Sequence, residues 1–254
     1  MKQITKKEIV WDWSIRVFHW LFAASVSMAL VIGLTVDDDS PLFEWHMLAG
    51  LTAGFLLLLR LVLFVVGSRP INWRGLLEAV RGIPAFVGDF FSKKENAEAG
   101  HNPMAWAVYL LMFGLLAGSV LTGVNMHIDW AEDVHEIFAW ALLAMIVAHL
   151  LGLVLHTLRF RENIALSMVT GRKRVRAGSG LKSPRPIFGL ALLAVSLAFM
   201  AQLVKNYQTG SGQIKLPWVQ MTVALGEDEA NEAKHDEHGD RNAYKDDESD
   251  EHDD

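Results

Sequence analysis

Long apolar runs separated by short polar segments extend over most of this chain. Five runs of roughly 20 apolar residues occur, at about 15–36, 47–66, 104–124, 136–157 and 187–204. About 20 helical residues cross a bilayer core of roughly 30 Å, and a soluble core does not require such runs repeatedly. The pattern therefore predicts five membrane-spanning helices. The fifth run, IFGLALLAVSLAFMAQLV, is the shortest but carries no charge.

Basic residues are distributed unevenly among the loops between these runs. Lys and Arg occur in the N-terminal segment, between the second and third runs, and between the fourth and fifth runs. The opposite loops, VDDDSPLFEW and NMHIDWAEDV, contain neither residue type. Because Lys and Arg are retained on the cytoplasmic side, we expect a multi-pass protein of the bacterial inner membrane, with its N-terminus cytoplasmic and its C-terminus periplasmic. Four tryptophans near span ends, Trp11, Trp13, Trp45 and Trp130, are expected at the membrane–water interface.

Charge is concentrated at the end of the chain. Residues 227–254 hold fourteen Asp or Glu and three Lys or Arg, a net charge of −11, which leaves the first 226 residues at about +5 out of the whole-chain −6. High charge with few apolar residues predicts disorder. The tail has three interpretations: a solvated segment, a loose metal collector through His235, His238 and His252, or a docking surface for a basic cytochrome c.

The absence of cysteine restricts the metal chemistry. No Cys occurs, which excludes disulfides, cysteine-ligated iron–sulfur clusters and covalently attached c-type haem. Any metal must be bound by His, Met or carboxylate side chains.

Histidines inside the expected spans are candidate functional residues, because ionisable groups are costly within a membrane. His135 and His149 are 14 residues apart in the fourth span, which is about 21 Å along a helix and close to four full turns. They therefore project from one helix face, near opposite membrane surfaces. His46, at the outer end of the second span, is level with His135. His19 lies about 25 Å below the outer end of the first span, near the depth of His149.

Two histidine pairs follow from these depths, His19 with His149 on the inner side and His46 with His135 on the outer side. Paired imidazoles fill both axial positions of a six-coordinate electron-transfer haem. We expect these four residues to bind two haem irons. A single membrane histidine can instead pack through a hydrogen bond or relay protons, but agreement in depth and face across four residues favours ligation.

Three further residues lie in the same region. His156 shares the face of His149 but lies about 10 Å further inward, where a cytoplasmic-surface or quinone-site role fits better than ligation. Arg16 and Arg60 are cations within the membrane register. A guanidinium group matches the geometry of a carboxylate, so Arg16 and Arg60 are candidate partners of haem propionates. The alternative is that each side chain extends to the membrane–water interface.

The residues resemble those of a known family, the bacterial cytochrome b561 group, which includes the cytochrome b subunits of nickel–iron hydrogenases and formate dehydrogenases. The resemblance covers roughly residues 8–175 and rests on WDWSIRVFHW (11–20), EWHMLAG with GFLLLLRLVLFVVGSRP beyond it, GHNPMAW (100–106) and VHEIFAWALLAMIVAHLLG (134–152). The resemblance implies that spans one, two and four supply four haem ligands, which by motif are His19, His46, His135 and His149. The fifth span and the tail depart from the family pattern.

The resemblance also implies exchange of electrons with a quinone, ubiquinone or menaquinone. It makes Asn102 a candidate quinone contact near the inner haem, with His101 and His156 as further candidates. Asn102 precedes Pro103 at a helix start, so helix capping is the alternative for Asn102. A solvated loop residue is the alternative for His101.

These observations predict an all-α fold, an integral membrane four-helix haem-binding bundle with a fifth transmembrane helix and a disordered acidic tail. We divide the chain into a di-haem bundle (1–175), a basic linker with the fifth helix (176–206) and a periplasmic acidic His-containing tail (207–254). The predicted function is electron transfer between the quinone pool and a periplasmic partner, a cytochrome c or a dehydrogenase or hydrogenase subunit.

Alternatives remain open for the function and the partners. The bundle could oxidise superoxide at its outer haem and pass the electrons to quinone. In a different class, membrane histidines could conduct a transition metal, although a transporter requires polar residues at the middle of several spans, and these are apolar here. Membrane lipid is an expected partner and nucleic acid is not, and a homodimer is an open alternative.

Overall fold

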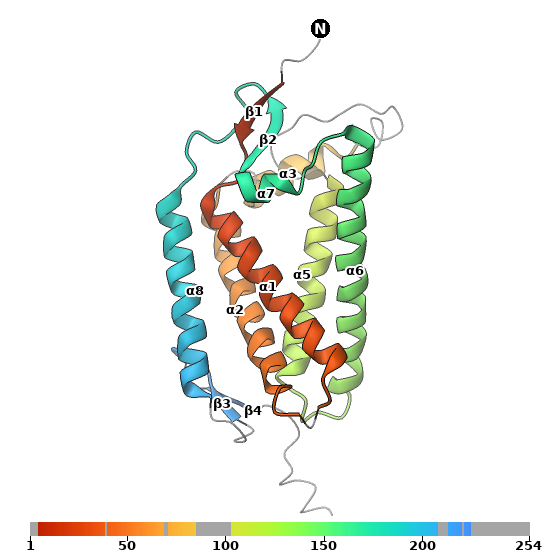
Figure 1. Ribbon diagram of the computed structural model, residues 1–254, viewed down its shortest axis with the longest axis vertical. Helices are drawn as coiled ribbons and strands as arrows, with labels where there is room; N and C mark the ends of the chain where they lie inside the picture. The colour runs from red at the N-terminus through yellow and green to blue at the C-terminus, as the bar shows by residue number, and fades with distance from the viewer. Residues whose placement is uncertain are drawn as a thin grey trace, which may run out of the picture.

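The computed structural model describes residues 5–38, 40–68, 71–84, 103–207, 213–219 and 221–224, most of them helical (Figure 1). Five helices are long and apolar enough to cross a membrane: α1 (Trp13–Thr35), α2 (Glu44–Val66), α5 (Pro103–Gly123), α6 (Ala131–Phe160) and α8 (Pro186–Asn206). The five predicted spans and the helical membrane fold are confirmed. The acidic residues 227–254 lie outside the described residues.

Polar residues lie at the N-termini of α1 and α6, which begin slightly before the apolar runs. Asp12 caps α1, because its Oδ1 accepts hydrogen bonds from the Ile15 amide at 3.1 Å and the Ser14 hydroxyl at 2.6 Å. Helix α6 begins with Glu132 and Asp133 in its first turn, where a helix dipole favours negative charge. It is long enough to carry both His135 and His149 on one continuous element.

Four of the five helices form the bundle. Helix α1 packs along α2, and α5 packs along α6, while α2 also contacts α5. One buried residue from each helix meets in a central layer: Val26, Ala53, Leu116 and Leu142. Among the described residues, α1 and α6 do not form an extensively packed pair. The bundle is therefore two tight helix pairs, with His19 and His46 on one pair and His135 and His149 on the other.

Helix α8 lies beside the bundle, against α1 and α2 (Figure 1). Its buried face consists of residues spaced by three or four positions: Gly189, Leu192, Ser196, Phe199 and Leu203. At Gly189 the two helices approach so closely that a Cβ atom would lie 2.5 Å from the Trp13 Cβ. The opposite face of α8 exposes large apolar side chains, among them Ile187 and Leu190, as a lipid-facing helix does.

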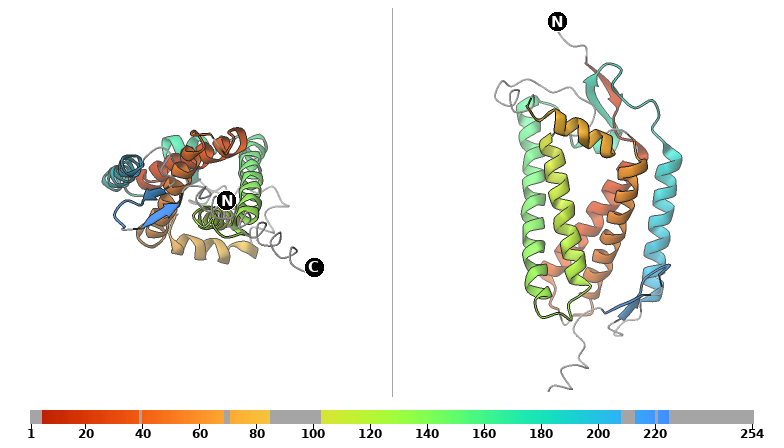
Figure 2. Two further views of the ribbon diagram at one scale, coloured as in Figure 1. Left: turned by 90° about the horizontal axis from the view of Figure 1, so that it is seen from below. Right: turned by 180° about the vertical axis from the view of Figure 1, so that it is seen from behind.

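Short elements cover the end of the bundle at which α1 begins (Figures 1 and 2). Strand β1 (Thr5–Ile9) pairs antiparallel with β2 (Arg172–Arg176), and α7 (Leu166–Thr170) and α3 (Trp73–Arg81) lie nearby. Trp11 is buried here, 4% exposed, and its Nε1 donates to the Ser167 hydroxyl at 3.0 Å. The expectation that Trp11 is an interfacial anchor is therefore wrong, because tertiary packing against α7 covers its ring. Trp13, Trp45 and Trp130 are exposed.

A second hairpin covers the other end. Strands β3 (Gln213–Lys215) and β4 (Thr222–Ala224) pair antiparallel, and Ile214 and Val223 pack against Leu48 of α2 and Leu203 of α8. The sequence predicts a disordered tail from residue 207 to residue 254. That prediction needs correction, because residues 213–219 and 221–224 form part of the folded protein through these apolar contacts.

Candidate functional site

The structure brings His46 and His135 together across the bundle. His46 lies in the first turn of α2, and His135 lies in the second turn of α6. Their ring centres are 6.0 Å apart and the ring planes meet at 72°. Both side chains are only partly buried, so each ring keeps an accessible edge. Phe43 stacks on the other side of His46, with ring centres 5.1 Å apart.

Backbone carbonyls fix the orientation of both rings. The Nδ1 of His46 lies 2.8 Å from the Ala29 carbonyl oxygen, and the Nδ1 of His135 lies 2.9 Å from that of Ser119. A carbonyl oxygen only accepts, so in each contact Nδ1–H is the donor. The neutral ring then carries its lone pair on Nε2, the nitrogen that remains for a metal. Both rings are therefore held in the tautomer that a metal ligand requires.

Thr122 supports the same ring of His135. Its Oγ1 lies 3.2 Å from the His135 Nδ1 and also donates to the Gly118 carbonyl at 2.8 Å. A hydroxyl group has only one hydrogen, and the Thr122 hydroxyl donates that hydrogen to the Gly118 carbonyl. In its contact with His135, the Thr122 Oγ1 is therefore the acceptor and the His135 Nδ1–H is the donor. The Nδ1–H of His135 is thus shared between the Ser119 carbonyl and the Thr122 hydroxyl.

Glycines allow the neighbouring helices to approach these imidazoles. A Cβ atom on Gly33 of α1 would lie 2.9 Å from the His46 Nδ1, and one on Gly123 of α5 would lie 3.1 Å from the His135 Cε1. Real Cβ atoms essentially never show a 2.9 Å contact. The close approach of α1 to His46 therefore depends on the absence of a side chain at position 33.

The spacing of the outer pair fits a metal ion between two imidazoles. Two metal–nitrogen bonds of about 2 Å each, with roughly 1 Å from each bound nitrogen to its ring centre, set the ring centres about 6 Å apart. The observed 6.0 Å agrees with that value. Haem iron with two axial histidines is one such arrangement, so the residues present fit the group.

His19 of α1 and His149 of α6 lie within electrostatic range of each other. Both are partly buried. The His19 ring packs edge-on against Trp20, with ring centres 5.2 Å apart. Its Nδ1 is buried and has no hydrogen-bond partner among the described residues. The inner pair therefore shares only α6 with the outer pair, and within the described residues His19 lacks the backbone anchor that both outer rings have.

Arg60 is the most deeply buried cation of the described chain, 1% exposed. Its Nη2 donates to the Ile71 carbonyl at 2.8 Å, and its guanidinium carbon lies 5.0 Å from the centre of the Tyr109 ring. The Nε and Nη1 groups have no hydrogen-bond partner within the described residues. Asp12, which is fully buried, interacts with Arg60 electrostatically. Buried donors without acceptors are costly, so Arg60 fits a site that receives an anionic group.

Arg16 has a different environment. Its Nε donates to the Met168 carbonyl at 3.2 Å and its Nη2 donates to the Val169 carbonyl, while its guanidinium carbon lies 4.2 Å from the centre of the Trp13 ring. The side chain therefore extends toward α7 and the end of the bundle. A propionate contact for Arg16 stays a prediction.

The remaining predicted residues are placed as follows. His156 lies one turn before the end of α6, half-buried, with its ring centre 4.8 Å from that of Phe160. His101 and Asn102 lie outside the described residues. Among the described residues, no group of three or more His, Asp or Glu side chains could hold a metal ion. The histidines of the bundle are thus gathered as pairs.

Sequence reasoning missed the groups that support the outer pair. Ala29 and Ser119 act through backbone carbonyls, which every residue type possesses, so no residue letter could identify them. Thr122 offered a weak signal, since it is a polar residue near the end of an apolar span. Tyr109 was missed as the neighbour of Arg60, because an aromatic residue in a span is usually a packing residue.

Comparison with known proteins gives two matches. Residues 10–171 match the family model described as prokaryotic cytochrome b561. A curated relative from Bradyrhizobium diazoefficiens, named "Probable Ni/Fe-hydrogenase B-type cytochrome subunit", is 21% identical over 217 residues, which cover 66% of this chain and 86% of the relative. No solved structure matches the chain.

Proposed function

Because this chain belongs to the prokaryotic cytochrome b561 family and is a membrane b-type cytochrome of electron transfer, we propose that it carries two haem b groups. We propose further that it moves electrons between membrane quinone and a redox partner on the periplasmic side. The observation that carries the proposal is the pair His46 and His135, whose ring centres are 6.0 Å apart and whose Nδ1 atoms are both anchored.

The outer haem is assigned to His46 and His135. Each ring offers its Nε2, since the Ala29 and Ser119 carbonyls occupy the Nδ1–H groups. Such partners fix ring orientation and increase the basicity of the ligand. Ligands that are already oriented also lower the reorganisation energy when the charge on the haem iron changes, and a low reorganisation energy favours electron transfer.

The inner haem is assigned to His19 and His149. His149 lies 14 residues after His135 on the same helix, about 21 Å along its axis, so two haems would lie at two depths of one bundle. Arg60 lies 14 residues after His46 on α2 and therefore at the depth of His149, on the face that carries His46. Its two donors without partners support a role as the propionate partner of the inner haem.

Haem b supplies reversible one-electron transfer when bound. The protein's own residues then perform three tasks: the four histidines fix the metal positions, Arg60 neutralises a carboxylate in a buried environment, and the apolar central layer excludes water between the two levels. Quinone exchange is proposed at the inner side, where His156 lies in α6, and His101 and Asn102 remain candidates for the same site. A quinone fits this chain because it can accept electrons one at a time, as a haem delivers them, from within the membrane.

The periplasmic partner is proposed from the relative, whose name identifies a subunit of a nickel–iron hydrogenase. A dehydrogenase or hydrogenase subunit that docks near the outer pair would exchange electrons with the haem there. The orientation that we propose, with the N-terminus in the cytoplasm of a bacterial inner membrane, rests on the Lys and Arg content of the loops. The bundle would then occupy residues 1–175, with α8 as an addition to it.

The test is the haem content of the purified full-length protein and of single histidine variants. We expect a reduced α-band of a b-type haem and about two haems per chain, each with two axial histidines. His46→Ala should remove the outer haem alone and His149→Ala the inner haem alone, as followed by electron paramagnetic resonance. His156→Ala serves as the matched control, because His156 lies on the same helix but outside both pairs.

The proposal is wrong if the wild type binds a single haem, or if His156→Ala removes the inner one. A colourless protein that retains zinc or copper would favour transport instead. Reduction of the purified protein by a quinol, followed by a screen of periplasmic acceptors, tests the quinone and partner assignments separately. Turnover with superoxide in place of those acceptors would favour the superoxide alternative.

A further inference from the structure

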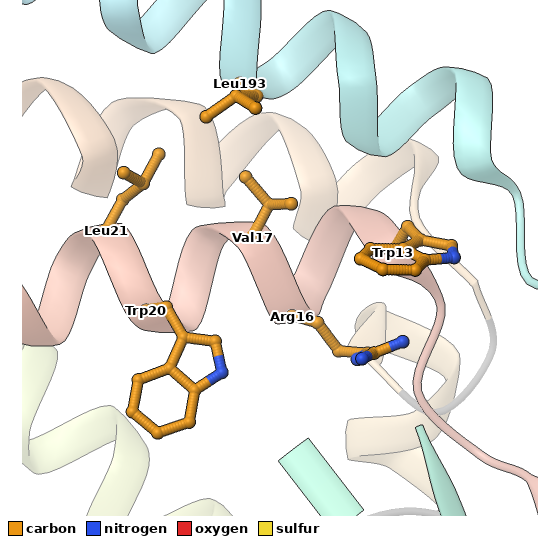
Figure 3. A pocket seen from close by; sticks show the side chains of 6 residues that line it. All are labelled: Trp13, Arg16, Val17, Trp20, Leu21 and Leu193. Atoms are coloured by element: carbon orange, nitrogen blue, oxygen red, sulfur yellow. The ribbon is translucent and has the colours of Figure 1, made fainter. Parts of the chain in front are cut away.

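Helix α8 contacts the bundle on two flanks. On one flank, Leu193 lies across from Val17 and Leu21 of α1, and these side chains line a pocket between the two helices (Figure 3). On the other flank, the ring of Phe199 stacks on that of Phe55 in α2, with ring centres 3.9 Å apart. The β3–β4 hairpin follows α8 in the chain and packs on this second flank.

The tip of the hairpin rests on the same two phenylalanines. The ring centre of Trp218 lies 5.8 Å from that of Phe199 and 5.7 Å from that of Phe55. At the base of the hairpin, Ile214 and Val223 are buried, 1% and 4% exposed. The hairpin therefore turns back along the sides of α8 and α2 and does not project away from the bundle (Figure 2).

These contacts place the Trp218 ring below the end of α8. Phe199 precedes Asn206, the last residue of α8, by seven residues, about 10 Å along the helix axis. Phe55 follows Glu44, the first residue of α2, by 11 residues, about 16 Å. Helix α8 has 21 residues and is about 31 Å long, close to the roughly 30 Å of a bilayer core. A ring in contact with both phenylalanines lies at membrane depth.

The tip is apolar on the side that faces away from the helices. Trp218 is 63% exposed, Val219 is 58% exposed and Met221 is 51% exposed. Exposed polar residues of the described hairpin lie on its strands, among them Lys215 and Thr222. Water would hydrate the apolar tip at a cost of about 25 cal/mol per Å², whereas acyl chains would cover it. Polarity along the hairpin thus changes in the direction in which depth increases.

The apolar tip is continuous with the exposed apolar surfaces of the two helices. Val195 lies one turn from Phe199 on α8 and is 42% exposed. Leu58 lies one turn from Phe55 on α2 and is 61% exposed. Both belong to helices that cross the membrane, so the surface that surrounds the tip is covered by lipid.

The backbone of the hairpin limits how far the tip can enter. Strands β3 and β4 pair with each other, and the Leu216 amide donates to the Met221 carbonyl at 2.9 Å. Irregular backbone does not face lipid within the hydrocarbon region, so the turn belongs at the boundary between headgroups and acyl chains. Trp218 has a left-handed backbone, with φ at 61°, which costs about 1 kcal/mol for a residue with a Cβ atom. Its ring contacts offset that cost.

We propose that the hairpin tip, formed by Trp218, Val219 and Met221, inserts into the lipid leaflet on its side of the membrane. Indole rings concentrate at the headgroup level, and the Val219 and Met221 side chains contact acyl chains. The three residues carry no charge, so the tip requires no particular headgroup. The hairpin anchors the chain beyond α8 to the membrane surface. This anchor uses none of the four paired histidines, and so it is independent of the haem assignment.

Site-directed spin labelling tests the proposal, because the chain contains no cysteine and each variant carries a single label. Full-length Val219→Cys is labelled and reconstituted into phosphatidylcholine vesicles. Collisions of the label are then measured with oxygen, which concentrates among acyl chains, and with a water-soluble nickel chelate. We expect the Val219 label to collide with oxygen and to lose collisions with nickel, as should a label at Leu197 on the exposed side of α8.

Lys215→Cys is the matched control, since Lys215 is an exposed residue of β3 in the same hairpin. Its label should collide with nickel more than with oxygen. Met221→Cys repeats the test at a second tip residue, and the haem content of each variant shows that the bundle is folded. Nickel access at Val219 and Met221 equal to that at Lys215 would place the tip in water and overturn the proposal. Protection of both labels from oxygen and nickel would overturn it too, because a second copy of the chain would then cover the tip.

Discussion

Gly33 of α1 lies against the imidazole of His46, at a position where a Cβ atom would be 2.9 Å from Nδ1. The same Nδ1 contacts the carbonyl of Ala29, one turn earlier on α1. Helix α1 therefore both orients His46 and sets how closely α2 approaches. Assembly of the outer pair depends on α1 although α1 contributes no ligand to it.

Substitution of Gly33 by alanine should displace His46 and weaken the outer haem site. The added methyl group cannot be accommodated without movement of the ring, and loss of the Ala29 contact should lower haem affinity by about tenfold or more. Haem stoichiometry and optical titration with added haem provide the measurement. Gly50→Ala in α2 is the matched control, since a Cβ atom there meets nothing within 4 Å. Equal haem loss in both variants would contradict the argument.

Substitution of Thr122 by valine should raise the midpoint potential of the outer haem alone. Removal of the hydroxyl takes one acceptor from the His135 Nδ1–H, which makes the imidazole a poorer donor to the oxidised iron. The Ser119 carbonyl remains, so the haem should stay bound. A potentiometric titration resolves the two haems, and Thr122→Ser should restore the original value. A shift of both potentials together would assign the effect to general perturbation of α5.

Substitution of Arg60 by glutamine should lower the midpoint potential of the inner haem. A nearby cation favours the reduced state, and loss of a charge-assisted contact of about 1.5 kcal/mol corresponds to about 60 mV for one electron. Arg74→Gln provides the control, because Arg74 is an exposed residue of α3. A shift in the midpoint potential of the outer haem without a shift in that of the inner haem would contradict the assignment of Arg60 to the inner haem.

The order of the turn that follows β2 should depend on the ionisation of Glu8. Its carboxylate accepts hydrogen bonds from the amides of Gly178 at 2.8 Å and Gly180 at 2.7 Å, and these contacts hold the pKa of Glu8 below its ordinary value of 4.5. A carboxyl group whose pKa is lowered on folding stabilises the folded state above its unfolded pKa, and that stabilisation is lost as the pH falls through the folded pKa.

Amide exchange of the turn, corrected for the intrinsic effect of pH, measures this dependence. Protection of the Gly178 and Gly180 amides should be constant at neutral pH and disappear only below pH 4.5. Glu8→Gln should reduce the protection at every pH. Glu136→Gln, at the start of α6, should have no effect on the turn. Protection that persists in Glu8→Gln would show that the strands alone order this segment.

Sequence alone was sufficient for the five long apolar helices, and it predicts histidines at two levels along them. Helix rise is constant, so a spacing of 14 residues fixes both the axial separation and the shared face of His135 and His149. The partners followed because His46 and His19 had to lie at those two depths. Sequence could not indicate that Trp11 is buried or that residues 213–219 and 221–224 pack on α2 and α8, since both depend on contacts between segments distant in the chain.

Hydrophobic periodicity and residue chemistry thus determined that this protein is a membrane helical bundle with histidines at two levels, because membrane thickness and helix geometry are the same for every chain. Only the tertiary structure decided how those histidines are held. The Ala29 and Ser119 carbonyls and the bare Cα of Gly33 act through the backbone, which no residue letter records. The environments of Arg16 and Arg60 also differ. Arg16 reaches the carbonyls of α7, whereas Arg60 is enclosed near Tyr109. Helix packing alone decides which groups each of these side chains contacts.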